Sequence, residues 1–263
     1  MPREHIAARC PYRVLRFSLE RTGRGCSTQK RMTLFNAASL RAAGIALGLS
    51  LLATVPLPPL NAADKASPTP SGVTRLFDGT TLKGWKPTPF GGAGEITVKD
   101  GAIQLEMGHM TGVTWTNAVP KMDYELSLEA KRTQGNDFFC GLTFPVGDSH
   151  VTLIAGGWGG ALVGISSING GDASENETTK FQRFEKDRYY KIRVRVEPKK
   201  IQAWIDDEQF VNLDTVGKSL ALRPGETELS KPLGIATWNT ASAIRNVQLK
   251  ALPPSGDPAA SKK

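Results

Sequence analysis

The chain is poor in the residues that build disulfide frameworks and zinc sites. It has three cysteines and three histidines among 263 residues. Cys10 and Cys26 lie near the N-terminus, so Cys140 has no internal partner in the remainder, and we expect it to be a buried small hydrophobic residue. With so few histidine and cysteine ligands, a zinc site is not expected. We predict no metal and no cofactor.

Several catalytic motifs are also missing. The sequence has no phosphate-binding P-loop, no GxSxG nucleophile motif and no dinucleotide fingerprint. Nothing in the sequence therefore points to nucleotide-dependent chemistry or to a serine hydrolase of that type.

Excess positive charge is missing from most of the chain, although the whole carries +8. Residues 1–63 hold nine basic and two acidic residues, a net of +7, which leaves about +1 for the rest. Phosphate binding needs a clustered surplus of Lys and Arg. A nucleic-acid partner is therefore not expected.

The N-terminal segment has the pattern of a bacterial-type signal peptide. A basic region precedes an uncharged apolar run at 42–55, and small residues follow at Ala62 and Ala63. The run is shorter than the roughly 20 residues that a membrane-spanning helix needs. We predict a signal peptide over 1–63, with Met32 as an alternative start and an uncleaved anchor as the alternative reading. The mature protein would be periplasmic or secreted, with no stable membrane span.

The remainder is predicted to form one domain. Residues 64–72 are rich in Pro, Ser and Lys and indicate a linker, and 253–263 indicate a disordered tail. Between them, 73–252 has a plausible length for a single domain with its own core.

Apolar and polar residues alternate with a period of two through this domain, and no segment shows a convincing helical period. One predicted inward face is Tyr124, Leu126, Leu128 and Ala130, and a second is Phe138, Cys140, Leu142 and Phe144. Such strands, separated by Gly, Asp, Asn and Pro, are typical of antiparallel sandwiches. We predict an all-β jelly-roll sandwich of two antiparallel sheets, with an up-and-down barrel as the alternative. Further strands are expected at 95–107 (a hairpin), 150–156, 161–166, 190–198, 200–206, 232–238 and 243–252.

Several segments resemble the 3-keto-disaccharide hydrolase domain family. The resemblance is seen in the segments LFDGTTLKGW at 76–85, VKDGAIQLE at 98–106, DYELSLEAK at 123–131 and GIATWNTASAIRNVQLKAL at 234–252. The resemblance covers 75–251 and implies a concanavalin A-like jelly roll that cleaves 3-keto-glycosides. We interpret LFDGTTLKGW as a clasp between the sheets, with Asp78 and Gly79 making its turn.

The middle of the domain departs from the family pattern. Family members usually carry Asn-Ser-Gly-Ile with an arginine and then Gly-Tyr-Glu-x-Gln-Ile, whereas this chain has a different, glycine-rich stretch between 137 and 180. The paired acids of laminarinase-type enzymes of this fold are also missing. Glu125 and Glu129 share a face but are expected to form a solvated surface. The resemblance therefore supports the fold more strongly than it supports the activity.

Cleavage of a 3-keto-glycoside asks for a base and an acid. His150, with an ordinary pKa of about 6.5, and Asp137 are our candidates for the base, and Glu175 is the candidate acid. Each also has a plainer reading as a surface or turn residue.

The stretch from 156 to 177 is the predicted substrate site. Glycines around Trp158 allow close approach of backbone or ligand, and the indole could stack on a sugar. Asn169 and Asp172 would supply polar contacts, and Trp115 an aromatic one, with His109 either near the mouth of the cleft or in a plain loop. The same acids fit no specific calcium motif.

Two functions remain open from the sequence. The first is an exported hydrolase or lyase of 3-keto-glycosides. The second is a non-catalytic, lectin-like or scaffold domain that binds carbohydrate. Both have a carbohydrate or glycoside as the partner.

Overall fold

A computed structural model describes residues 72–255 of the chain. The predicted signal peptide at 1–63, nearly all of the linker, and the tail from 256 lie outside the described residues. Within the described part, no helix is long and apolar enough to cross a membrane.

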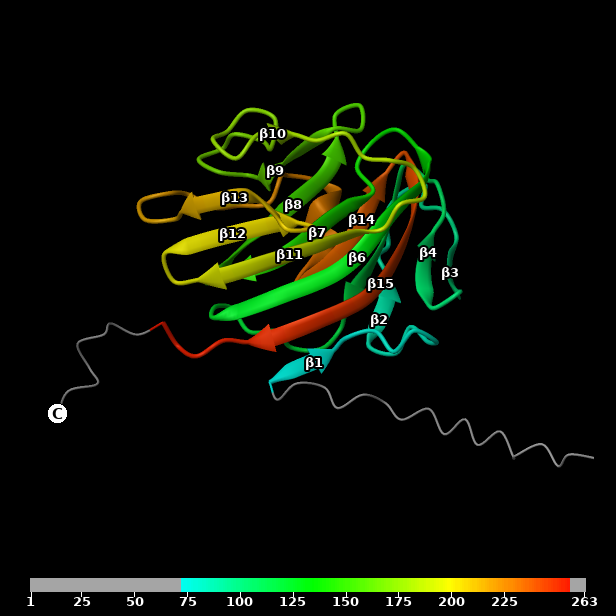
Figure 1. Ribbon diagram of the computed structural model, residues 1–263, viewed down its shortest axis with the longest axis horizontal. Helices are drawn as coiled ribbons and strands as arrows, with labels where there is room; N and C mark the ends of the chain where they lie inside the picture. Colours follow the sequence, from blue (N-terminus) through cyan, green and yellow to red (C-terminus); the bar gives the residue numbers. More distant parts are fainter. Residues whose placement is uncertain (1–71, 256–263) are drawn as a thin grey trace, which may run out of the picture. The chain divides into compact units, whose positions relative to one another are not determined.

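Two antiparallel sheets pack face to face (Figure 1). One has eight strands in the order β13-β12-β11-β6-β15-β4-β3, and β1 pairs with β15 beyond this path. Its strands are β1 (Val73–Arg75), β3 (Ile96–Lys99), β4 (Ala102–Leu105), β6 (Tyr124–Gly135), β11 (Tyr190–Glu197), β12 (Lys200–Ile205), β13 (Glu208–Asp214) and β15 (Thr240–Ala251).

The other sheet has seven strands in the order β10-β9-β8-β7-β14-β5-β2. They are β2 (Trp85–Pro87), β5 (Met110–Trp115), β7 (Cys140–Val146), β8 (Ser149–Gly157), β9 (Leu162–Ser166), β10 (Lys180–Phe181) and β14 (Leu233–Trp238). A short 3-10 helix, η1 (Glu226–Ser230), precedes β14. Because the two sheets share no strand, the sandwich prediction is confirmed and the barrel alternative is wrong.

The core lies between the sheets and follows the period-two alternation. Tyr124, Leu126, Leu128 and Ala130 on β6 are at most 2% exposed, as are Ile192 and Val194 on β11. The residues between them on β6 and β11 lie on the outer face and are partly or fully exposed. This is the arrangement expected of an antiparallel sheet with one buried face.

The predicted position of Phe138 is wrong. It lies outside the core, next to Met110, Ala236 and Ile154 on the other face of the seven-stranded sheet, and Phe139 enters the core instead. The Asp137 carboxylate accepts a hydrogen bond from the Phe138 N–H at 2.7 Å, and β7 begins only at Cys140. This turn shifts the alternation by one residue.

Cys140 has the predicted character. It is 1% exposed, and its burial raises the pKa of the thiol to about 12. Because the thiolate is the reactive form, we expect the folded chain to resist an aromatic disulfide reagent at neutral pH and to react fully in denaturant. The measurement uses a chain with Cys10→Ser and Cys26→Ser, so that Cys140 alone reports. Stoichiometric labelling of the folded chain within minutes would contradict the buried position.

Candidate functional site

The outer faces of the two sheets differ in character. On the eight-stranded sheet, Glu125 forms ion pairs with Arg193 and Arg195, both at 3.1 Å. Glu129 forms an ion pair with Arg245 at 2.7 Å. Hydrogen bonds from Asn246 and Arg245, and the positive charge of Arg245, hold the pKa of Glu129 below its usual value against the opposing effect of burial. These long side chains pair with one another on the outer face, and the Glu125 and Glu129 side chains are only 16% and 28% exposed, so they are less solvated than expected.

The seven-stranded sheet instead presents small residues on its outer face, and a cavity of about 450 Å³ lies above them. Short side chains leave room over the floor, which a face of long charged residues would fill. Its lining comprises His109, Met110, Asp137, Phe138, Gly141, Thr143, Thr152, Ile154, Trp158, Ser166, Asp172, Arg223, Pro224, Glu226, Thr227, Ala236 and Trp238.

Asp137 stands at one wall, at the turn before β7. Its N–H donates to Thr240 Oγ1 at 2.9 Å, and its Oδ1 accepts from the Phe138 N–H at 2.7 Å. No described residue donates a hydrogen bond to Oδ2. The carboxylate is thus fixed through one oxygen, and the residue lines the cavity.

Glu226, the first residue of η1, also lines the cavity, although it lies far from Asp137 in the sequence. Its Oε1 accepts from the Gly91 N–H at 3.1 Å, while Oε2 is buried and has no hydrogen-bond partner among the described residues. Helix η1 packs closely on β14, since a Cβ added at Gly234 would lie 2.7 Å from Ser230 Cβ. Glycine at 234 therefore lets η1 hold Glu226 at the site.

Asp172 has a different role from these two acids because both of its oxygens are engaged. Oδ1 accepts from the Ser166 hydroxyl and from the Ala173 N–H at 2.8 Å, and Oδ2 pairs with Arg223 Nη1 at 2.9 Å. Its carboxylate joins two segments that form a cavity wall.

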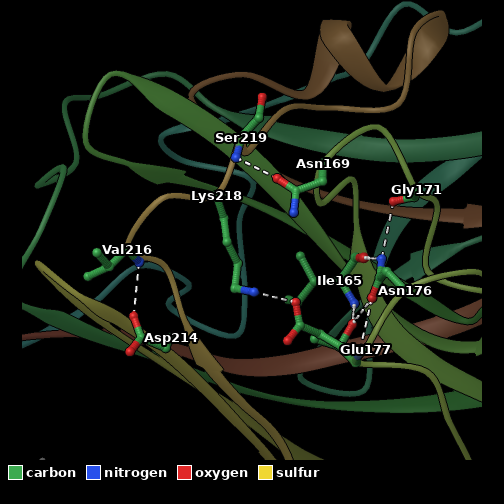
Figure 2. Close-up of polar contacts among 10 residues, drawn as sticks. Ile165, Asn169, Gly171, Asn176, Glu177, Asp214, Val216, Lys218 and Ser219 are labelled. Atoms are coloured by element: carbon green, nitrogen blue, oxygen red, sulfur yellow. Dashed lines mark hydrogen bonds and ion pairs between the residues drawn. The ribbon is translucent and has the colours of Figure 1, made fainter.

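The same two segments are joined further along, as Figure 2 shows. Lys218 pairs with Glu177 at 2.7 Å, and the Ser219 N–H donates to Asn169 Oδ1 at 2.8 Å. Asn176 Nδ2 donates to backbone carbonyls, among them that of Ile165 at 2.7 Å. The contacts of Lys218 and Ser219 fasten the segment that carries Arg223 and Glu226 to the loop after β9, and those of Asn176 hold that loop to β9.

Aromatic side chains complete the cavity. Trp158 is 44% exposed at the turn between β8 and β9, and the Trp238 ring lies 4.1 Å from that of His109 between centroids, tilted by 56°. An exposed aromatic face such as that of Trp158 can pack on the apolar face of a sugar ring. The cavity thus combines aromatic surfaces with two carboxylates that each keep one oxygen unpaired.

The structure brings three of the seven sequence-predicted site residues to this cavity, namely Asp137, Trp158 and Asp172. Glu175 is exposed in the loop after β9, and Asn169 is occupied by its bond to Ser219. Trp115 packs edge-on against Trp85 at 5.2 Å and on the core. None of these three lines the cavity.

His150 also lies outside the cavity, although it shares the outer face of β8 with Thr152 and Ile154. Its pKa is lowered by burial first and by Lys231 and Lys121 next, with Glu228 opposing them. It lies further along β8, where it pairs with Pro145.

Arg223, Glu226 and Trp238 were missed from the sequence. For Trp238 a signal was present, because alternation on 232–238 with Ile235 inward places Trp238 outward. The residues around Glu226, RPGETE, look like any polar loop. Within residues 72–255, no three His, Cys, Asp or Glu side chains gather into a metal-ligand set.

Comparison with known proteins identifies the family. The model of the 3-keto-alpha-glucoside-1,2-lyase-like domain matches residues 72–250, while no curated protein matches. Among solved structures, the Crh5 transglycosylase in complex with NAG is similar at a TM-score of 0.50 and 10% identity, over 70% of this chain and 86% of that one.

Two further solved structures are similar over most of their length. The Bacillus licheniformis beta-glucanase has a TM-score of 0.45 at 11% identity, over 70% of this chain and all (100%) of that one. The carbohydrate-binding module CBM66 from Bacillus subtilis has a TM-score of 0.42 at 13% identity, over 64% and 96%. At such identities a structural likeness speaks only to the fold, which is the predicted sandwich of two antiparallel sheets. With the match to the family model across nearly all of the described residues, this carbohydrate-active chain belongs to the family of 3-keto-alpha-glucoside-1,2-lyase-like domains.

Proposed function

We propose that this domain binds a 3-keto-glycoside in the cavity over the seven-stranded sheet and cleaves its glycosidic bond. One observation carries the proposal: Asp137 and Glu226 line the same cavity as Trp158 and Trp238, and each acid is fixed through one oxygen. The other oxygen of each faces no hydrogen-bond donor from the described residues. A base and an acid beside an aromatic platform are the parts that this chemistry needs.

The reaction balances without an oxidant or a metal. The ketone at C3 acidifies the C2–H, so one carboxylate removes that proton. The electron pair forms the C1=C2 double bond, and the C1–O bond to the leaving group breaks. The second group, in its protonated form, gives a proton to the departing oxygen. Addition of water across the double bond then completes a net hydrolysis.

We further propose that the protein acts after export, in the periplasm or outside the cell. The basic segment and apolar run before residue 64 support this location. A precursor that keeps its N-terminal segment and stays in the cytoplasm would contradict it.

A second candidate is a carbohydrate-binding domain without turnover. Two observations favour it: the stretch from 137 to 180 departs from the family pattern, and Asp172 is neutralised by Arg223. Under this reading the aromatic platform remains and the acids only accept hydrogen bonds from sugar hydroxyls.

The test is incubation with methyl 3-keto-α-glucoside, with methyl α-glucoside as the substrate control. We expect release of methanol from the keto sugar alone, and a rise in KM of about tenfold in Trp158→Ala because an aromatic contact is lost. Trp204→Ala is the matched control, since Trp204 lies under Arg193 at 3.8 Å on the other sheet. Binding without methanol release would favour the second candidate, and no binding of the keto sugar would exclude the first.

A further inference from the structure

The turn that carries Trp158 has a demanding backbone. Trp158 has φ +47°, Gly156 +82° and Gly160 +101°, and the β8–β9 pairing shifts register between Ala155 and Gly157. A bulky residue in the left-handed region costs free energy and persists only where its surroundings enforce it. The indole is itself 44% exposed, so burial of the ring in the core does not supply that enforcement.

Arg132, which belongs to the other sheet, holds this turn through hydrogen bonds to its backbone. It lies on β6, and its side chain is 8% exposed. Its Nη2 donates to the carbonyl oxygen of Gly160 at 2.9 Å and to that of Gly156 at 3.3 Å. One guanidinium therefore bonds to both ends of the turn, and its planar group lies 5.4 Å from the centroid of the Phe139 ring.

Arg132 is an expensive residue to bury. No carboxylate among residues 72–255 makes an ion pair with it, and its Nε is buried without a hydrogen-bond partner. Burial lowers the pKa of its guanidinium, while the charge of Asp137 opposes that change. A buried charge of this kind adds little net stability over an apolar residue of the same size, so its contribution is better sought in what it holds in place.

The two glycines agree with this arrangement. A Cβ added at Gly160 would lie 3.1 Å from Arg132 Nη1 and 2.5 Å from Asn136 Oδ1, and one at Gly156 would lie 2.6 Å from Arg132 Nη2. The close approach predicted from the glycine-rich sequence is thus an approach by a guanidinium to the backbone.

We propose that Arg132 is a positioning residue for Trp158, which fixes the ends of its turn and so presents the indole to the cavity. The part that concerns sugar affinity rests on the proposed function. The part that concerns the position of Trp158 does not, and the two are measured separately.

The first measurement needs no ligand. The chain has five tryptophans, so labelling with 5-fluorotryptophan gives five fluorine resonances, and Trp158→Phe assigns the one of interest. We expect Arg132→Met to shift or broaden the Trp158 resonance and leave the other four in place. Arg75→Met, at an exposed position on β1, is the matched control and should move none of them.

Two further variants guard against a loss of folding in Arg132→Met. Arg132→Lys keeps the charge but cannot present the same planar group, so an intermediate shift is expected. Gly160→Ala leaves Arg132 intact and pushes the turn away from it, and it should disturb the same resonance. An unchanged Trp158 resonance in both Arg132→Lys and Gly160→Ala would overturn the proposal. Equal disturbance of all five tryptophan resonances would also overturn it.

The second measurement is a double-mutant cycle on affinity for methyl 3-keto-α-glucoside. We expect Arg132→Met to weaken binding about tenfold in the wild-type background, as Trp158→Ala does, and less than twofold when Trp158 is already alanine. An undiminished effect in the Trp158→Ala background would show that Arg132 acts through another group such as Asp137, and would overturn the proposal. The two measurements can disagree. If Arg132→Met moves the Trp158 resonance but the wild type binds no sugar, the proposed function is refuted and the positioning role remains supported.

Discussion

Replacing Trp85 with alanine is expected to lower the free energy of unfolding by about 3–5 kcal/mol, the usual cost of truncating a large core aromatic residue. Trp85 is 6% exposed and packs edge-on against Trp115 at 5.2 Å between ring centroids. Its indole N–H donates to the carbonyl oxygen of Leu76 at 2.9 Å. The variant would thus create a cavity and leave a buried carbonyl without its donor.

The position of this bond explains the size of the effect. Leu76 follows β1, which pairs with β15 in the eight-stranded sheet, whereas Trp85 begins β2 in the seven-stranded sheet. Between them, Asp78 Oδ1 accepts the N–H groups of Thr80 and Thr81, both at 2.7 Å. The segment 76–85 therefore joins the two sheets, as its interpretation as a clasp required, and Asp78 is used in its turn.

Urea denaturation followed by circular dichroism measures this prediction. Trp85→Phe is the matched variant, because it keeps one aromatic ring in the core and loses the pyrrole ring with its N–H donor. It should cost about 1–3 kcal/mol, the range for one unsatisfied buried group. An unchanged urea midpoint for Trp85→Ala, together with a loss of sugar binding, would mean that the residue serves the ligand and not the fold.

The sequence predicted the sandwich because its strands bury one face only. Alternation from Tyr124 to Ala130 places every second side chain between the sheets, and that signal is local. The same rule failed at Phe138, because the chain turns before β7, where the Phe138 N–H donates a hydrogen bond to the Asp137 carboxylate. A turn of this kind shifts the period by one residue without any change in hydrophobicity.

The site was harder to predict because its parts are distant in sequence. Asp137 and Glu226 are brought together by the order of strands in the seven-stranded sheet and by η1, and neither has a motif around it. The glycines around Trp158 did signal a close approach, but their partner Arg132 lies on the opposite sheet. In contrast, His150 and Glu175 had the right chemistry at positions that the topology leaves outside the cavity.

Removal of either cavity carboxylate should reduce turnover of methyl 3-keto-α-glucoside by about 10²–10⁴-fold, the range for loss of a general acid or base. The variants are Asp137→Asn and Glu226→Gln, which keep the side-chain volume and lose the ability to exchange a proton. Binding should change much less, since both amides can still accept a hydrogen bond from a sugar hydroxyl. The loss is therefore expected in kcat and not in KM.

The leaving group assigns the two roles. A 4-nitrophenyl 3-keto-α-glucoside releases a stable phenolate that needs no proton, so the variant that lacks the acid should recover most of its activity on it. The variant that lacks the base should stay inactive on both substrates, because the C2–H proton must still be removed. His150→Gln and Glu175→Gln lie outside the cavity and serve as matched controls that should keep turnover within about twofold. Wild-type rates in both Asp137→Asn and Glu226→Gln would place the chemistry elsewhere, and a loss confined to His150→Gln would return the base to β8, beyond the cavity.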